Sequence, residues 1–172
     1  SPVAHSRSPR LYGHWLARYG LAGHYVPLHV GQADLAEVIR ALPRMGFVGV
    51  NVTIPHKETV LRLADAVSDR AALIGAANTI TFRADGKIHA DNTDGYGFLA
   101  NLRQHAPDWR ANAGPAAVLG AGGAARAILA ALIEAGAPEI RLANRTRARS
   151  DALRGEFGGR VTVFDWVQAG SM

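Results

Sequence analysis

Val118-Leu-Gly-Ala-Gly-Gly-Ala-Ala-Arg-Ala127 joins an apolar run to an alanine-rich run through three glycines. The run before the glycines predicts a buried strand at 116–119, and the run after them predicts a helix at 124–135. A second strand is predicted at 139–143, so the stretch lies inside a strand–helix–strand unit. Such a unit is the usual setting of a Gly-rich turn that binds a dinucleotide.

The glycines of this turn have separate expected roles. Gly120 would make the tight turn, Gly122 would let the backbone approach a phosphate, and Ala125 would replace a third glycine where helix packs on strand. The pyrophosphate would then sit on the helix N-terminus, where free N–H groups and the dipole favour an anion. A tight turn that binds nothing is the alternative.

The residues after the second strand indicate which dinucleotide is preferred. An NAD site usually has Asp or Glu about 20 residues past the glycines, to bind the ribose 2′-hydroxyl. This chain has Asn144-Arg-Thr-Arg-Ala-Arg149 there instead. Guanidinium groups suit a 2′-phosphate, which Arg binds with two parallel hydrogen bonds. We therefore expect NADP rather than NAD, with a solvated basic turn as the alternative.

The composition limits the classes of protein to which the chain can belong. The chain has 172 residues, of which 48% are hydrophobic and 19% charged, as expected for a well-packed globular protein. No apolar run is long enough to span a bilayer, and no leader opens the chain, so we expect a cytoplasmic protein without membrane contact. The absence of Cys excludes thiolate metal sites, and the His residues lack ligand spacing, so no metal is expected. The net charge of +5 is spread along the chain, which argues against nucleic acid as a partner.

Strand-like and helix-like segments alternate along the whole chain, which indicates α/β architecture. Further helices are predicted at 9–19, 34–44, 55–65 and 95–104, and further strands at 24–30, 48–53, 78–82 and 87–90. Asp85-Gly86 provides the turn of a hairpin between the last two strands.

Two prolines and a glycine interrupt the pattern after residue 105. We expect a first domain at 1–105, a junction at 106–115 and a second domain at 116–172, with the site in the cleft between the two domains. Both ends look cut, because no strand leads into residue 1 and the second domain shows about half of a dinucleotide-binding fold.

Ser6 and Ser8 flank the start of the helix that Pro9 opens. Small hydroxyl groups beside free helical N–H groups can bind a carboxylate, although the spacing alone favours plain helix capping.

A second polar cluster, Asn51-Val-Thr-Ile-Pro-His-Lys57, ends a predicted strand and enters a predicted helix. Lys57 would lie in the first turn of that helix, where the dipole disfavours a cation by about 0.3–1 kcal/mol. An acid–base lysine could use this placement, since positive potential and burial both lower a lysine pKa. An exposed lysine that tolerates a poor position is the alternative.

A third cluster, Asp91-Asn-Thr-Asp94, also ends a predicted strand and begins a helix. Asp94 alone could be a helix N-cap. Asn78 and Thr79 add an amide and a hydroxyl at the start of another strand. Together the three clusters carry groups that suit a small polyhydroxylated carboxylate.

These motifs, taken in order, resemble the shikimate dehydrogenase family. The series that carries the resemblance is Ser6-Arg-Ser-Pro9, Asn51-Val-Thr-Ile-Pro-His-Lys57, Ala77-Asn-Thr79, Asn92-Thr-Asp-Gly95, Gly120-Ala-Gly-Gly-Ala124 and Asn144-Arg-Thr-x-x-Arg149. It covers nearly the whole chain, with Ala90 where the family often has Gly.

The resemblance implies an N-terminal three-layer α/β substrate domain followed by a partial Rossmann NADP-binding domain. It implies reversible NADPH-dependent reduction of 3-dehydroshikimate to shikimate, with Lys57 as the acid–base residue paired with Asp94. The residues it implies for the substrate are Ser6, Ser8, Thr53, Asn78 and Asp94. Those it implies for the cofactor are Asp69, Gly120, Ala121, Gly122, Gly123, Ala124, Asn144, Arg145, Thr146 and Arg149.

Three other functions stay open. A quinate/shikimate dehydrogenase using NAD would be expected to carry an acidic residue where Asn144-Arg145 stands. A methylene-tetrahydrofolate dehydrogenase also pairs a catalytic lysine with a similar fold, but it does not need Ser6 and Ser8. A shikimate-binding module without catalysis is the third. We expect a monomer or a homodimer.

Overall fold

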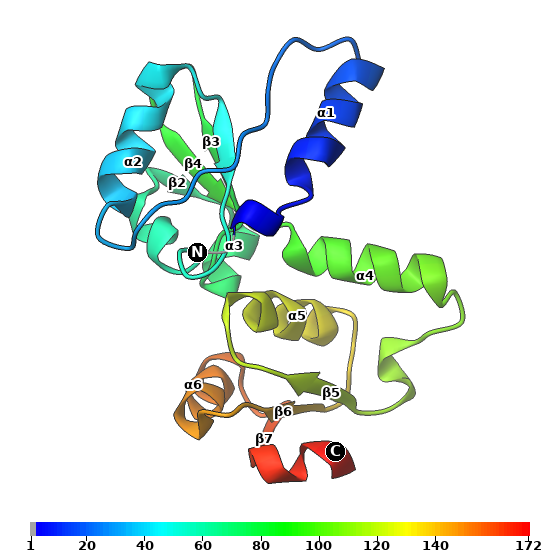
Figure 1. Cartoon of the computed structure of the whole chain (residues 1–172). Coiled ribbons are helices and arrows are strands. Elements are labelled where there is room, and N and C mark those ends of the chain that lie inside the picture. Colours follow the sequence, from blue (N-terminus) through cyan, green and yellow to red (C-terminus); the bar gives the residue numbers. More distant parts are fainter. Residues whose placement is uncertain (1–2) are drawn as a thin grey trace.

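The computed structural model describes residues 3–172, in which the strands form two sheets (Figure 1). The first sheet has the order β1-β3-β4-β2 and the second the order β5-β6-β7. The strands are β1 Gly49–Asn51, β2 Ala66–Val67, β3 Thr79–Phe82, β4 Ile88–Asp91, β5 Ala116–Leu119, β6 Ile140–Ala143 and β7 Val161–Phe164. The α-helices are α1 Ser8–Arg18, α2 Leu35–Ala41, α3 Asp69–Ile74, α4 Asp94–His105, α5 Gly123–Glu134 and α6 Arg147–Phe157. Short 3-10 helices are Val3–His5, Leu42–Met45, Thr59–Leu63, Ala111–Ala113 and Trp166–Ser171.

A hairpin of β3 and β4 forms the centre of the first sheet. Its turn is the predicted one: the Arg83 N–H donates to the Lys87 carbonyl at 2.9 Å, and Gly86 has a φ of +83°, which glycine adopts without strain. β1 pairs antiparallel with β3, and β2 pairs parallel with β4.

The second sheet is parallel throughout, and its three strands end at the same edge. Parallel strands present their carboxyl ends at one edge of a sheet, and ligands of α/β sheets bind outside that edge. Gly120, Asn144 and Asp165 follow β5, β6 and β7 and therefore meet at this edge. The predicted α/β class, with a parallel sheet in the second half, is confirmed.

Each sheet has its own apolar core. The first core includes Ile39, Val60 and Ile80, and the second includes Leu129, Ile140, Leu142 and Leu153. A third, smaller cluster of Ile74, Ala76 and Ala127 joins α3 of the first half to α5 of the second. Figure 1 shows α5 between the two sheets. The small residues of the third cluster let backbones from the two halves approach closely.

The strand predicted at 24–30 is wrong. The segment makes no ladder hydrogen bonds with another strand among the described residues, although it runs beside β1. A cavity of about 380 Å³ lies between His24–Leu28 on one side and β1 on the other. Strand structure requires a neighbour at hydrogen-bonding distance, and no strand among residues 3–172 pairs with this segment.

The helix predicted at 55–65 is also wrong. Turns cover residues 54–58, and a 3-10 helix follows at Thr59–Leu63. The Lys57 carbonyl accepts the N–H of Ala77 at 2.8 Å, so a tertiary partner replaces the helical i+4 donor. The expectation that Lys57 opposes the dipole of its own helix therefore fails with the helix.

Other predicted elements match within a few residues. The helix expected at 34–44 ends as an α-helix at Ala41 and continues as the 3-10 helix Leu42–Met45, since Pro43 has no N–H to donate. The sequence pattern predicted neither β2 nor α3, which are too short for a periodic pattern to show.

Candidate active site

The centre of the site is an ion pair between two sequence-predicted residues. The Lys57 Nζ donates to the Asp94 Oδ2 at 2.6 Å, and the two side chains are 12% and 26% exposed. The other oxygen, Asp94 Oδ1, accepts from the Asn78 Nδ2 at 2.8 Å. The structure therefore brings Lys57, Asn78 and Asp94 together from three separate segments.

Asp94 is not the N-cap of α4. The N-cap is Thr93, and Asp94 is the first helical residue. The Asp94 N–H donates to the Asn92 Oδ1 at 3.0 Å, so a different side chain satisfies this end of the helix. The carboxylate of Asp94 is consequently free for Lys57 and Asn78, and the capping alternative is wrong.

A network of backbone and amide hydrogen bonds orients Asn78. Its Oδ1 accepts from the Thr79 hydroxyl at 2.8 Å and from the Thr93 N–H at 3.1 Å. The backbone N–H of Asn78 donates to the Asp91 carbonyl at 3.0 Å, and the backbone carbonyl of Asn78 accepts from the Val52 N–H at 2.7 Å. Such a satisfied amide cannot flip freely, so the Nδ2 stays directed at Asp94.

The predicted hydroxyl groups line the cavity of about 380 Å³ beside β1. Ser6, Ser8 and Thr53 all lie on its wall. The Ser8 N–H donates to the Ser6 Oγ at 3.2 Å, so Ser6 does support the start of α1. The hydroxyl proton of Ser6 remains available to a ligand, because accepting that bond does not use it.

Tyr25 and Asn51 lie in the same cavity and were not among the predicted site residues. The Tyr25 hydroxyl donates to the Asn51 Oδ1 at 3.1 Å, and the Tyr25 ring stacks on Tyr12 with centroids 4.4 Å apart. Burial raises the pKa of the Tyr25 phenol, and the neighbouring Ser8 side chain opposes that effect. The period of two between Asn51 and Thr53 could have indicated Asn51. No sequence signal marks Tyr25, because only packing places its segment.

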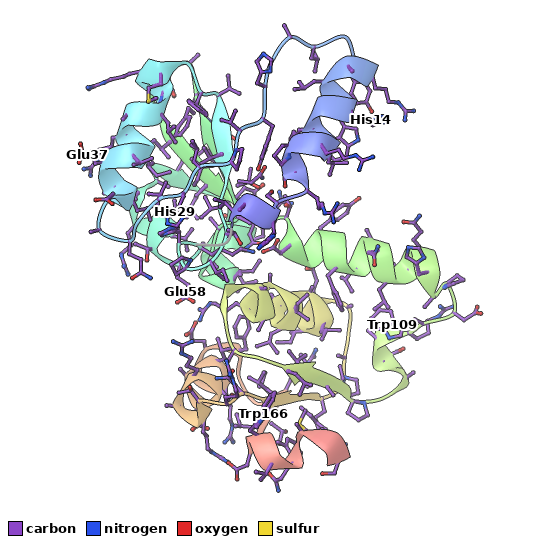
Figure 2. The ribbon with its side chains drawn as sticks, viewed as in Figure 1. His14, His29, Glu37, Glu58, Trp109 and Trp166 are labelled. Carbon is purple, nitrogen blue, oxygen red and sulfur yellow. The ribbon has the colours of Figure 1, made fainter. Side chains whose placement is uncertain are left out.

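Lys57, Asn78 and Asp94 do not line the cavity beside β1. Lys57 lines a second cavity, the nucleotide cleft. It has about 620 Å³ and is lined by residues of both halves, among them Lys57, Ala121, Gly122, Gly123 and Arg149. Glu58, labelled in Figure 2, lies on its first-sheet wall. Lys57 therefore lies where the Gly-rich turn meets the polar side chains of the first half.

The Gly-rich turn fits a pyrophosphate. Gly120 has a φ of +108°, a conformation that favours glycine, and its N–H donates to the Ala143 carbonyl at 2.8 Å. Gly122 is the N-cap of α5, and a Cβ built there would meet nothing within 4 Å, so the space above it is open. The first N–H groups of α5 have no partners within the helix and can bind an anion in that space.

Gly123 has a role that the sequence did not reveal. A Cβ at Gly123 would lie 3.2 Å from the Lys57 Cβ and 3.4 Å from its Cδ. The start of α5 thus contacts the stem of Lys57 directly. This contact brings the anion-binding end of α5 next to the acid–base candidate.

The three arginines of the basic turn differ in their partners. Arg147 forms ion pairs with Asp165 and, at 3.7 Å, with Asp151. Arg145 and Arg149 form no ion pair with any residue in the range 3–172. Their positive charges are therefore available to a phosphate, whereas that of Arg147 is already used.

Other predicted cofactor residues do not line the nucleotide cleft. The Asn144 Nδ2 donates to the Thr146 carbonyl at 2.9 Å and so shapes the basic turn. Asp69 is the first residue of α3 and lines neither cavity. The remaining predicted residues outside the cleft lining are Gly120, Ala124, Arg145 and Thr146.

Residues 3–172 lack two further classes of feature. No helix there is both long and apolar enough to cross a membrane. No group of three or more His, Asp or Glu side chains is placed to hold a metal ion.

Comparison with protein families finds two matches that follow each other along the chain. Residues 1–80 match the shikimate dehydrogenase substrate binding domain. Residues 103–169 match the family described as shikimate / quinate 5-dehydrogenase.

Individual relatives agree with these matches. The chain is 74% identical over 172 residues to the shikimate dehydrogenase (NADP(+)) of Cereibacter sphaeroides, and it covers 62% of that protein. It is 73% identical over 171 residues to the protein of the same name from Paracoccus denitrificans, covering 99% of this chain and 61% of that protein. The chain thus spans about three fifths of the length of these relatives.

A solved structure has the same fold. Shikimate 5-dehydrogenase from Thermus thermophilus, solved with shikimate, is 39% identical and superposes with a TM-score of 0.83. The match covers 98% of this chain and 67% of that one. Another structure of the Thermus enzyme holds both NADP(H) and shikimate.

Proposed function

The chain belongs to the shikimate dehydrogenase family, and from this premise we propose that it carries out the reversible, NADPH-dependent reduction of 3-dehydroshikimate to shikimate. The observation that carries the proposal is the 2.6 Å pair of Lys57 and Asp94, in which Lys57 also lines the cleft that the Gly-rich turn lines. We further propose that residues 1–105 form the substrate domain and 116–172 the dinucleotide-binding domain, with 106–115 as their junction.

The first-sheet cavity supports binding of the substrate. Ser6 and Ser8 would hold the carboxylate through their hydroxyl groups, and Thr53, Asn78 and Asp94 would bind the ring hydroxyls. Asn78 and Asp94 present fixed polar atoms because their mutual hydrogen bond and the surrounding network hold them in place. A site of this kind rejects analogues that lack a hydroxyl, since its polar groups are then left without partners.

Lys57 would supply the proton. During reduction of the ketone, negative charge develops on the carbonyl oxygen, and an ammonium group beside it stabilises that charge and donates the proton. Asp94 orients the ammonium through the 2.6 Å hydrogen bond. In the reverse direction the neutral amine would accept the proton of the substrate hydroxyl.

The nucleotide cleft would hold the cofactor. Bound NADPH would supply the hydride from C4 of its nicotinamide ring. The backbone of Gly120, Ala121, Gly122, Gly123 and Ala124 would bind the pyrophosphate, and Asn144, Arg145, Thr146 and Arg149 the adenosine 2′-phosphate. Asp69 stays a prediction that no contact in this structure supports. A monomeric or homodimeric state and a cytoplasmic location also remain proposals.

The direct test is the absorbance of the nicotinamide band when the purified chain receives shikimate with either NADP or NAD. Reduction of NADP that depends on shikimate, with much slower reduction of NAD, supports the proposal. Reduction of NAD at the same or a greater rate would move the assignment to an NAD-using quinate/shikimate dehydrogenase. Shikimate binding by calorimetry without reduction of either cofactor would identify a binding module, and the proposal would be wrong.

A further inference from the structure

The Arg126 side chain connects three helices. It projects from α5, is only 12% exposed, and its Nε donates to the carbonyl of Ile74 at 2.7 Å. Its Nη1 donates to the Glu156 Oε1 at 3.1 Å, and its Nη2 pairs with the other oxygen of the same carboxylate. Ile74 ends α3 of the first half, and Glu156 lies in α6 of the second.

The surroundings of Arg126 are shaped for a guanidinium group. Gly75 has a φ of +70°, and a Cβ there would overlap the guanidinium, whose Cζ lies 3.1 Å from that position. The ring centroid of Phe157 lies 5.8 Å from the Arg126 Cζ. The carbonyl of Ile74 is one of those that a helix C-terminus leaves without a helical donor, so a cation there is favoured. Gly75, Phe157 and the Ile74 carbonyl therefore surround the guanidinium group on three sides.

The position of Arg126 in α5 links it to the proposed site. Its N–H donates to the Gly122 carbonyl at 3.1 Å, so it lies one helical turn after the anion-binding end of α5. Gly123, in the same turn, contacts the stem of Lys57. Glu156, the ion-pair partner of Arg126, lies in α6, which is the helix that follows the basic turn. A shift of α5 against α3 would therefore change the distance between Lys57 and the Gly-rich turn.

We propose that Arg126 is a positioning residue, which holds the Gly-rich turn of the second half against the Lys57 segment of the first half. Arg126 does so through a hydrogen bond to the end of α3 and a bidentate ion pair with α6. The effect of this residue on catalysis, as distinct from its effect on geometry, rests on the proposed function. Relative motion of two domains is expected unless the interface between them is large and hydrophobic. The buried apolar cluster that joins the two halves has only three residues, so the polar contacts of Arg126 add to a small interface.

A distance measurement tests the proposal without any ligand. The chain has no cysteine, so Glu37→Cys and Val167→Cys allow two spin labels on otherwise unchanged protein. Glu37 lies on α2, and Val167, 91% exposed, follows Trp166 in the other half, as the labels of Figure 2 show for Glu37 and Trp166. Pulsed electron resonance should give one narrow distance distribution for this labelled protein. Arg126→Ala should shift the distribution or broaden it about twofold.

Conservative variants separate positioning from loss of folding. Arg126→Lys can still donate to Ile74 but cannot form the two-pronged pair, so its distribution should lie between those of the labelled parent and Arg126→Ala. Glu156→Gln should broaden the distribution to a similar intermediate extent. The matched control is Arg154→Ala, since Arg154 is an exposed α6 residue without an ion pair among residues 3–172, and it should change nothing. Unchanged distributions in Arg126→Lys and Glu156→Gln would overturn the proposal even if Arg126→Ala does not fold.

An activity measurement extends the test to the site. Arg126 and Glu156 also line the nucleotide cleft, so the loss in rate has to be compared with the loss in cofactor binding. If the chain reduces NADP with shikimate, Arg126→Ala should lower kcat about 10- to 100-fold, because misplacement of reacting groups by about 1 Å has effects of this size, and should lower the affinity for NADPH by a clearly smaller factor. Arg126→Lys should recover part of the rate. Equal losses in kcat and in NADPH affinity would contradict positioning. If the labelled parent shows no turnover, the proposed function fails. The distance distributions still show whether Arg126 positions the two halves.

Discussion

The two halves of the site are made of different parts of the chain. The first half offers side chains: Lys57, Asn78 and Asp94 are joined by hydrogen bonds of 2.6 and 2.8 Å. The second half offers the backbone N–H groups at the start of α5, together with Arg145 and Arg149, which form no ion pair among residues 3–172. Proton transfer depends on one side chain at one position. A pyrophosphate, in contrast, can be bound by the free backbone N–H groups of any small residues. The comparison predicts that a single substitution lowers activity strongly in the first half of the site and more weakly in the second half.

The largest effect is expected from Lys57→Met. This change removes the ammonium group that pairs with Asp94, and the loss of a general acid typically lowers the rate by about 10²–10⁴-fold. Steady-state kinetics of shikimate oxidation should show the loss in kcat with little change in KM. The control is Lys87→Met, because Lys87 is the other lysine of the chain and lies exposed at the hairpin turn. A parallel loss of shikimate affinity and rate would count against a chemical role for Lys57.

The second effect concerns Arg145 and Arg149. Replacing both with Ala should weaken NADPH binding by about 100-fold or more, since each of the two charge-assisted hydrogen bonds contributes about 1.5–3 kcal/mol, and NADH binding should be almost unaffected. Fluorescence titration with the two reduced cofactors measures the ratio. Arg147→Ala is the matched control, as Arg147 is already paired with Asp165. Equal weakening of NADPH and NADH in the double variant would exclude the 2′-phosphate assignment.

The third prediction concerns the packing that holds the two halves together. A Cβ at Gly95 in α4 would lie 2.9 Å from the Ala127 carbonyl oxygen and 3.1 Å from the Ala131 Cβ in α5. Gly95→Ala should therefore lower the free energy of unfolding by about 1–3 kcal/mol. Gly97→Ala, in the same helix with nothing within 4 Å, should raise it by about 0.5–1 kcal/mol. Urea denaturation compares the two, and equal stability of both variants would show that α4 and α5 are not closely packed there.

The smallest effect is expected at Asp91, which ends β4 in the first half. Its carboxylate accepts from the Arg70 guanidinium, from the Ser68 Oγ at 2.6 Å and from the Asn92 N–H at 2.7 Å. The hydrogen bond from Arg70 is the main reason that the pKa of Asp91 lies well below its ordinary value of 3.8. A lowered pKa in the folded state stabilises the protein above pH 3.8, and this contribution is lost as the pH falls further.

Asp91→Asn tests this linkage. Since Arg70 is half exposed, the difference from the parent should be at most about 1 kcal/mol at neutral pH and should shrink towards about pH 3. Urea denaturation at several pH values measures it. Asp108→Asn, an exposed aspartate in the junction, should give the same stability as the parent at every pH. A difference for Asp91→Asn that grows with acidity would contradict the sign of the pKa change.

Much of the second half was predictable from the sequence. The glycines between an apolar run and an alanine-rich run specify a strand, a tight turn and a helix through local rules, and β5, the turn and α5 lie within one residue of their expected places. The turn at Gly86 follows from the same kind of rule. Such features depend on backbone conformations that only a few residue types favour.

The first half was less predictable. Residues 24–30 have the pattern of a strand, but no neighbouring strand pairs with them among residues 3–172. Residues 55–65 have the pattern of a helix, but the Lys57 carbonyl bonds to Ala77 instead. Tyr25 was missed because its place beside Asn51 depends on how a whole segment packs. Each case is decided by a partner far away in the sequence.

The sequence by itself determined the α/β class, the Gly-rich turn, the basic turn and the residue types of the site, because these depend on local conformation and on the chemistry of each side chain. Only the tertiary structure decided that Asp94 binds Lys57 rather than capping α4, that Arg147 is paired while Arg145 and Arg149 are not, and that Arg126 joins α3 to α6. The partners in these contacts lie 18 to 52 residues apart in the sequence. A hydrogen bond or ion pair between them depends on separations of a few ångströms that no local pattern encodes.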